Sequence, residues 1–127
     1  MSNELILVVE DDPASRKLMR DVLEFKGYRS QEAETAEDGL RLVGEERPAL
    51  ILMDVQLPGM SGIDALIILR GAAETSDIPV IAVTASVMHR QEKELIAAGF
   101  DDWERKPISV ASLLGKMRKL LDRSKAP

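Results

Sequence analysis

The 127-residue chain contains no cysteine. Disulfides, thiolate metal sites and cysteine nucleophiles are therefore excluded. Aromatic residues make up only 3% of the chain, which counts against a flavin-binding module, because such a site needs aromatic side chains beside the isoalloxazine ring. Apolar runs fall far short of the ~20 residues of a membrane helix. Residues 1–4 lack the basic start of a secretory signal. We therefore expect a cytoplasmic protein.

The charge and the hydrophobic content indicate one globular domain. The net charge is −5, with 17 basic and 22 acidic residues, so binding to nucleic acid through a basic surface is not expected. A hydrophobic fraction of 45% over 127 residues suffices for one core. We expect a single domain over residues 1–127, with a core of about 4–122. The tail 123–127 is too short to form a second domain.

Short apolar runs alternate with amphipathic stretches along the chain. The predicted strands fall into two classes. Apolar runs occupy residues 5–9, 49–53 and 80–83, and polar runs occupy residues 28–33 and 101–105. Helical patterns cover residues 13–26, 35–43, 61–74, 86–98 and 110–121. The first of these has Leu18, Met19, Val22 and Phe25 at helical spacing. Five strand–helix units predict an α/β protein with a parallel sheet and helices on both faces.

The polarity of the strands predicts their order. Strands that are buried on both faces are apolar throughout, so the first, third and fourth strands belong in the centre of the sheet. The polar second and fifth strands then lie at its edges. The order 2-1-3-4-5 satisfies this requirement, whereas the order 3-2-1-4-5 places the polar second strand inside. We therefore predict a flavodoxin-like doubly wound (βα)5 fold, whose ligand crevice lies where strands 1 and 3 meet.

Polar residues follow the carboxyl ends of four predicted strands. Glu10 and Asp11 follow the first strand, and Asp54, Thr84 and Lys106 follow the third, fourth and fifth. These ends share one edge of a parallel sheet, so the three carboxylates should converge. Three close carboxylates repel one another unless a cation compensates them. Oxygen ligands without histidine or cysteine indicate a hard cation, and few carboxylates with retained water suit Mg²⁺.

Lys106 and Thr84 would add a positive charge and a hydroxyl donor to the same rim. Together with a metal, these groups form a site for a tetrahedral anion. A carboxylate nucleophile in such a site can accept a phosphoryl group as an aspartyl phosphate. A metal ion and a lysine neutralise the charge that develops on the transferring group. Asp54 is therefore the candidate phosphoacceptor.

Four sequence segments resemble the motifs of response-regulator receiver domains. They are residues 7–13 (LVVEDDP), 52–62 (LMDVQLPGMSG), 83–85 (VTA) and 106–107 (KP). Any one of them is weak on its own, but together they span nearly the whole chain at the expected spacing. The chain is similar to stand-alone receivers of the DivK type and to the receivers of hybrid kinases. The resemblance implies a phosphoprotein of two-component signalling or a phosphorelay, rather than an enzyme with a separate substrate.

The resemblance also implies a role for each site residue. Asp54 corresponds to the phosphoacceptor. Asp11 corresponds to a direct Mg²⁺ ligand, with Glu10 acting mostly through metal-bound water. The backbone carbonyl of Gln56 would complete the metal shell. Mg²⁺ is therefore the expected cofactor.

Further positions correspond to the phosphoryl-binding and switch residues of the family. Thr84 would bond to the phosphoryl group, Ala85 would leave room for it, and Lys106 would pair with it. Trp103 lies where the family usually has tyrosine, phenylalanine or histidine as its switch aromatic. Tryptophan is bulkier and departs from that pattern, which puts the usual coupling between the threonine and the aromatic ring in question.

The resemblance also implies which proteins bind the chain and which residues control the lifetime of the phosphoryl group. The donor would be a sensor histidine kinase or a histidine phosphotransfer protein. The signal would leave through the helix at 86–98, the strand with Trp103 and the face around Val110 and Leu114, toward protein effectors. A phosphorylation-dependent dimer through this face is compatible with the family. Gln56 and Ser86 occupy the positions that tune hydrolysis of the aspartyl phosphate.

Two alternative functions use the same residues. An aspartyl-nucleophile phosphatase of the haloacid-dehalogenase type would carry Asp-x-Asp on its first strand. Here the candidate nucleophile is on the third strand, and Gln56 occupies the position of the second aspartate. A pseudo-receiver adaptor would keep the fold without phosphorylation, but the intact set of Asp11, Asp54, Thr84 and Lys106 argues against it.

Overall fold

The computed structural model describes residues 3–85 and 89–125, which form five strands and five helices in strict alternation. The strands are β1 (Leu5–Val9), β2 (Arg29–Ala33), β3 (Leu50–Asp54), β4 (Val80–Thr84) and β5 (Asp102–Arg105). The helices are α1 (Pro13–Phe25), α2 (Ala36–Glu45), α3 (Gly62–Gly71), α4 (His89–Ala98) and α5 (Val110–Lys125). The predicted strand–helix units are all present within the described residues. Residues 86–88, where the fourth helix was predicted to begin, lie outside them.

The five strands form one parallel sheet in the order β2-β1-β3-β4-β5. The predicted order is therefore confirmed. β1, β3 and β4 are buried along their whole length, whereas β2 is mostly half-exposed and β5 buries only Glu104. The polarity of the edge strands thus reflects their exposure.

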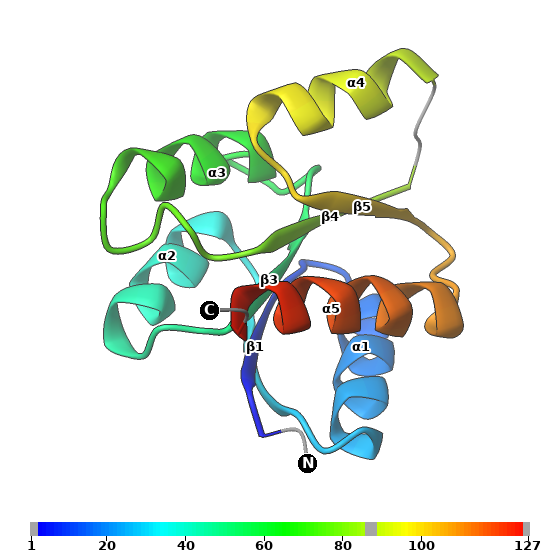
Figure 1. Cartoon of the computed structure of the whole chain (residues 1–127). Helices are drawn as coiled ribbons and strands as arrows, with labels where there is room; N and C mark the ends of the chain where they lie inside the picture. Colours follow the sequence, from blue (N-terminus) through cyan, green and yellow to red (C-terminus); the bar gives the residue numbers. More distant parts are fainter. Residues whose placement is uncertain (1–2, 86–88, 126–127) are drawn as a thin grey trace.

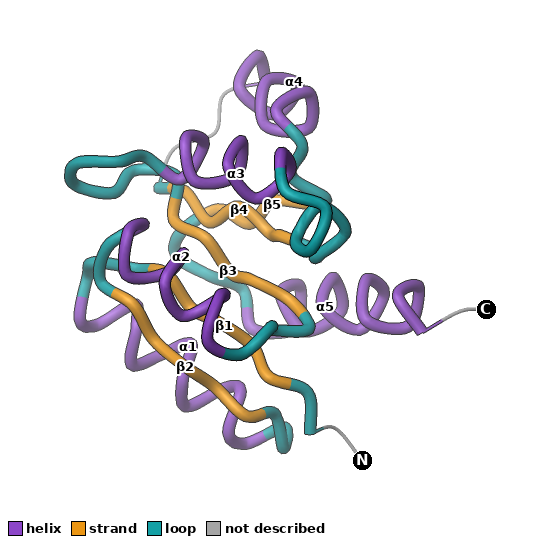
Figure 2. Tube along the Cα trace, turned by 90° about the vertical axis from the view of Figure 1, so that its left-hand side faces the viewer, coloured by secondary structure: helices purple, strands orange, loops and turns teal. Residues whose placement is uncertain are grey.

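Helices cover both faces of the sheet, with α1 and α5 on one side and α2 and α3 on the other (Figures 1 and 2). Alternate side chains of the central strands supply two separate cores. Leu7, Ile51 and Ala82 belong to the core that also holds residues of α2, α3 and α4. Ile6 and Leu52 belong to the core beneath α1 and α5. In the described part of the chain, no helix combines the length and apolar character needed to cross a membrane.

The third helix is shorter than the sequence pattern predicts. It was expected over residues 61–74 and ends at Gly71, because Ala72 adopts an extended conformation at the C-cap. The Thr75 hydroxyl donates to the carbonyl of Leu69 at 2.6 Å, and so satisfies a carbonyl that the helix leaves without a partner. The Arg70 guanidinium donates to the carbonyls of Ile78 and Gly99 at 2.7 and 2.9 Å. These bonds tie the end of α3 to the segments that precede β4 and β5.

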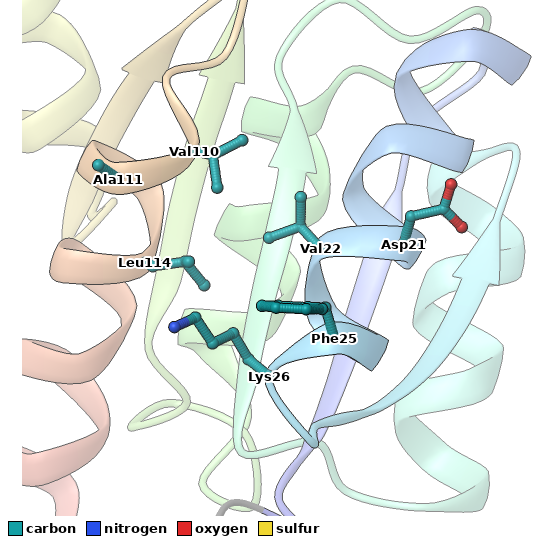
Figure 3. A pocket seen from close by; sticks show the side chains of 7 residues that line it. All are labelled: Asp21, Val22, Phe25, Lys26, Val110, Ala111 and Leu114. Atoms are coloured by element: carbon teal, nitrogen blue, oxygen red, sulfur yellow. The ribbon is translucent and has the colours of Figure 1, made fainter.

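The apolar face predicted for α1 is only partly buried. Met19 is buried, but Phe25 is 85% exposed and Leu18 is 42% exposed. Phe25 and Val22 line an open groove between α1 and α5, opposite Val110 and Leu114 (Figure 3). Helical periodicity placed these α1 residues on one face. It does not show that the centre of the buried face lies nearer to Leu23, which is fully buried.

Candidate metal and phosphoryl site

Parallel strands bring the predicted site residues to one edge of the sheet. Glu10 follows β1, and its backbone amide continues the ladder by donating to Ala33 at 2.9 Å. Asp54 ends β3 and Thr84 ends β4. Lys106 directly follows β5, and its amide donates to the carbonyl of Thr84 at 2.8 Å. Residues separated by almost a hundred positions in the sequence are therefore neighbours here.

Three carboxylates converge at this edge, as predicted. Glu10, Asp11 and Asp54 each offer an oxygen atom, and these atoms lie within 4.8 Å of one another. Glu10 and Asp54 are buried, whereas Asp11 is exposed. Lys106 Nζ lies 2.6 Å from Glu10 Oε1 and 3.3 Å from Asp54 Oδ2. One lysine therefore bridges two buried carboxylates, and the cluster of three acids and one base keeps excess negative charge.

Glu10 is the carboxyl group of this cluster whose ionisation is most disfavoured. Its Oε2 accepts a hydrogen bond from the amide of Asp12 at 3.2 Å. Its Oε1 is buried, and its close partner is the Lys106 ammonium at 2.6 Å. Burial and the neighbouring Asp54 raise the pKa of Glu10 to about 7, against the opposing effect of Lys106. Within the described residues, the Glu10 carboxylate shares its one cationic partner, Lys106, with Asp54, so an added cation would relieve the remaining charge.

The nearby carboxylates raise the pKa of Lys106, against the effect of burial. Burial by itself lowers the pKa of the ammonium group, but contact with Glu10 and the charge of Asp54 outweigh this effect and raise it. Lys106 therefore stays protonated at neutral pH. The peptide bond between Lys106 and Pro107 is cis.

Asp54 is held in place by the backbone around it. The amide of Gln56 donates to Asp54 Oδ1 at 2.9 Å, and the amide of Val55 donates to the carbonyl of Val83 at 3.1 Å. Gly62 packs against this turn so closely that a Cβ atom would lie 2.3 Å from the carbonyl oxygen of Asp54. Only glycine fits at that position without moving the phosphoacceptor candidate.

The remaining predicted residues within the described part of the chain lie in or shortly after β3, β4 and β5. Thr84 is buried, Ala85 directly after it is exposed, and Gln56 is exposed on the β3 side of the rim. Trp103 is half-buried on β5, in register with Ala82. Its ring and residues of α4 line a groove, and Lys116 Nζ lies 5.1 Å from the ring centroid. Ser86 lies outside the described residues.

Among the described residues, those named for the output face line two separate grooves. Trp103 lines a groove with Ile96 and Ala97 of α4. Val110 and Leu114 instead line the groove between α5 and α1. Their positions on α5 turn them toward α1 rather than toward Trp103, which a sequence pattern without the angle between helices does not reveal.

One residue of this region, Arg16, was not predicted from the sequence, nor was the detailed role of another, Gly62. Arg16, on the first turn of α1, donates to the carbonyls of Glu10 and Asp11 at 3.0 and 3.4 Å. Gly62 provides the close approach beside Asp54. The glycine stands inside the segment 52–62 that was singled out, but an arginine on a helix has no sequence signal that marks it as a partner of a backbone carbonyl.

The donor set fits a magnesium ion. Carboxylate oxygens from Glu10, Asp11 and Asp54 are available at one point, and Glu10 shares Lys106 with Asp54. A hard divalent cation prefers such all-oxygen sites, and Mg²⁺ needs few protein carboxylates because it retains water ligands. An added cation would also relieve the repulsion between the three acids.

Comparison with known proteins assigns the chain to a family. Residues 6–118 match the family model of the response regulator receiver domain. The chain belongs to this family. It is 38% identical over 116 residues to the polar-differentiation response regulator DivK of Brucella anthropi, an alignment that covers 91% of the chain and 94% of that protein. The resemblance to DivK-type receivers is thereby confirmed.

Solved receiver structures have the same fold. The signal receiver domain of a histidine kinase from Syntrophus aciditrophicus is 30% identical, with a TM-score of 0.89 over 98% of this chain and 94% of that one. The receiver domain of a sensor histidine kinase from Pseudomonas aeruginosa is 28% identical, with a TM-score of 0.87 over 94% and 98% of the two chains. That structure is described as having a magnesium ion coordinated in its active-site cleft. Receiver domains act in two-component signalling, where they receive phosphoryl groups from histidine kinases and act on effectors.

Proposed function

We propose that Asp54 accepts a phosphoryl group from a phosphohistidine of a partner protein, in the presence of Mg²⁺. One observation carries this proposal. Oxygen atoms of Glu10, Asp11 and Asp54 lie within 4.8 Å of one another, and Lys106 contacts two of these residues. This combination brings together a carboxylate nucleophile that can form an aspartyl phosphate, a set of metal ligands and a fixed positive charge. The chain then works as a switch that alters its own covalent state and has no separate substrate to turn over.

In the proposed reaction, a carboxylate oxygen of Asp54 attacks the phosphorus atom of the phosphohistidine. The phosphorus–nitrogen bond breaks as the phosphorus–oxygen bond forms, and the departing imidazole takes up a proton. The Gln56 amide, at 2.9 Å from Oδ1, fixes the direction of the Asp54 carboxylate before attack. Lys106 Nζ, at 3.3 Å from Oδ2, stabilises the charge on the transferring group.

Glu10, Asp11 and Asp54 would hold the metal ion, with the backbone carbonyl of Gln56 as a further ligand. Bound Mg²⁺ supplies positive charge to the oxygens of the phosphoryl group. Thr84 and Ala85 complete the proposed pocket, the former as a hydrogen-bond donor and the latter as a small side chain that admits the phosphoryl group.

We propose that Gln56 and Ser86 set the lifetime of the aspartyl phosphate. The exposed side chain of Gln56 lies on the rim of the site, two residues after Asp54. An amide in that position can orient the water molecule that attacks phosphorus. Unchanged dephosphorylation rates in both Gln56→Ala and Ser86→Ala would contradict this role.

The proposed exit of the signal is the surface formed by α4, β5 and α5. Trp103 and Ile96 give it an apolar centre, and Glu92 and Lys93 give it a charged margin. We propose that a histidine kinase, a phosphotransfer protein or an effector binds there, with a phosphorylation-dependent dimer as a further use of the surface. Phosphorylation-dependent binding that survives Trp103→Ala and Ile96→Asp would place the exit elsewhere.

Incubation with acetyl phosphate and Mg²⁺ tests the central reaction. One phosphoryl group should be added per wild-type chain, and none to Asp54→Ala or to wild type in a chelator. Equal labelling of Asp54→Ala would refute the assignment. Asp38→Ala is a matched control, because it removes an exposed aspartate of α2 and leaves the site in place.

A further inference from the structure

The sequence Glu10–Asp12, here called the acidic loop, links β1 to α1 and carries two of the three carboxylates. The parallel ladder between β1 and β2 has Val9 opposite Ala33 as its last pair, and the Glu10 amide makes one further bond to Ala33. The Glu10 carbonyl thus lies beyond the end of the ladder. A backbone carbonyl close to a buried site needs a donor, and here that donor is a side chain.

Arg16 provides this donor from the first turn of α1. Its Nη1 lies 3.0 Å from the Glu10 carbonyl and 3.4 Å from the Asp11 carbonyl. Side chains on a helix point toward its N-terminus, so a residue on the first turn reaches back over the segment that precedes the helix. The planar guanidinium group can contact both carbonyls and still offer its other edge to an anion.

Arg16 also contacts two carboxylates at the end of β2, of which Glu32 is half-buried and Glu34 is 70% exposed. Arg16 Nε lies 3.3 Å from Glu32 Oε1, and Nη1 lies 3.4 Å from Glu34 Oε1. The Arg16 side chain is only 17% exposed, and that of Glu32 is 24% exposed. Partial burial limits the screening of the Arg16–Glu32 ion pair by solvent. The Arg16 guanidinium, with its contacts to the two carbonyls and to Glu32, is here called the fork, and it ties the acidic loop to β2.

We infer that Arg16 is a positioning residue for the metal site, which fixes the acidic loop so that Asp11 and Glu10 point toward Asp54. This inference rests on the proposed Mg²⁺ binding of the previous section. Arg16 contacts backbone carbonyls and the carboxylates of β2, whereas the described contacts of the metal-site carboxylates are with Lys106 and backbone amides. Its action on the metal is therefore indirect, through the direction of the ligands.

Charge and positioning predict opposite results for the loss of Arg16. Removal of a positive charge near three carboxylates leaves the region more negative, which by itself strengthens cation binding. Loss of the fork frees the acidic loop, which weakens cation binding. The sign of the change in Mg²⁺ affinity thus separates a positioning role from a purely electrostatic effect.

Arg20 is a matched control. It lies one turn further along α1 and contacts Glu32 at 3.0 Å. No contact between Arg20 and the acidic loop appears among the interactions of the described residues. Arg20→Ala therefore removes the same charge from the same helix and the same glutamate, and leaves the carbonyls of Glu10 and Asp11 bonded to Arg16.

Calorimetric titration with Mg²⁺ tests the inference on wild type, Arg16→Ala, Arg16→Lys and Arg20→Ala. The dissociation constant should rise roughly 10-fold in Arg16→Ala, the lower range found for groups that orient metal ligands. It should also rise in Arg16→Lys, which keeps the charge but loses the fork. In Arg20→Ala it should stay equal to wild type or fall. At saturating Mg²⁺, phosphorylation of the Arg16 variants by acetyl phosphate should return close to the wild-type rate.

Thermal unfolding in a chelator shows which variants are folded. If Arg16→Ala is unfolded, the Mg²⁺ affinity of Arg16→Lys tests the positioning role. Wild-type or tighter Mg²⁺ binding in the folded Arg16 variants would overturn the positioning role, as would an equal loss in Arg20→Ala. A wild-type protein that binds no Mg²⁺ would instead refute the proposed function, and the inference with it.

Discussion

Two buried glutamates of this protein each face a lysine, yet their surroundings differ. Glu10 lies at the carboxyl end of the sheet, 2.6 Å from Lys106, beside two further carboxylates. Glu104 lies on the edge strand β5, 2.9 Å from Lys116, and its Oε2 also accepts a hydrogen bond from Ser112 at 3.0 Å. Glu10 shares its lysine with the buried Asp54, whereas Glu104 has both a lysine and a hydroxyl group as partners.

The comparison separates a site from a scaffold. Lys116 also donates to the carbonyl of Trp103, so the Glu104 pair ties α5 to β5 with its polar atoms satisfied. At the Glu10 pair, one lysine faces two buried carboxylates, so excess negative charge remains inside the protein and costs free energy. Such a cost is typical of a site that binds a cation and reacts. The following changes test whether the two pairs differ in this way.

The two lysines should differ most in their effect on phosphorylation. In Lys106→Met, labelling by acetyl phosphate should slow by about 100-fold, because a preorganised positive charge near the transferring group is lost. In Lys116→Met, the rate should stay within about two-fold of wild type, because Lys116 contacts Glu104 and Trp103 rather than the site. Rates at saturating Mg²⁺ provide the measurement. Equal slowing in both variants would remove the distinction.

The two glutamates should differ in their effect on stability. Glu104→Ala should lower the free energy of unfolding by about 1–3 kcal/mol, since it leaves Lys116 and Ser112 without their charged partner. Glu10→Gln should have no such cost in a chelator, because it removes one of three repelling charges. Urea unfolding of both variants measures the difference. A larger loss in Glu10→Gln than in Glu104→Ala would show that the Glu10 pair is the scaffold.

Glu10 should also make stability depend on pH. Its pKa rises from 4.5 to about 7 on folding, so the folded protein binds the proton more tightly than the unfolded chain. The stability contributed by this proton is complete below pH 4.5 and disappears as the pH rises through 7. Urea unfolding in a chelator should therefore show this loss, and Mg²⁺ should reverse it above pH 7. The same pH dependence in Glu10→Gln would mean that another group is responsible.

The sequence predicted the residues of the site better than the residues that hold them in place. Glu10, Asp54, Thr84 and Lys106 follow strands, and the polarity of the edge strands defined their order, so their convergence was predictable. Arg16 was not predicted, because its role depends on where a helix lies relative to the loop before it. Periodicity likewise placed Phe25 on a common face, although it is exposed (Figure 3). Hydrophobic spacing identifies a helix, but the packing angle decides which side is buried.

The smallest expected effect concerns Trp103, the only tryptophan of the chain. The ring lies on β5, the strand that carries Lys106 at its end, and against residues of α4. Mg²⁺ or phosphorylation should therefore change its fluorescence. For phosphorylation, the fluorescence change of the wild type is compared with that of Asp54→Ala, which cannot be phosphorylated at this position. A flat signal under conditions where calorimetry detects Mg²⁺ binding would show that Trp103 does not respond to the site.

The position of the phosphoryl group tests the assignment of Asp54 most directly. After incubation with acetyl phosphate and Mg²⁺, borohydride reduces an aspartyl phosphate to homoserine, which peptide mass spectrometry locates. The convergence of Glu10, Asp11 and Lys106 on Asp54 predicts homoserine at position 54, and none when a chelator replaces Mg²⁺. Homoserine at Asp11 or Asp12, or equal labelling with the chelator, would contradict it.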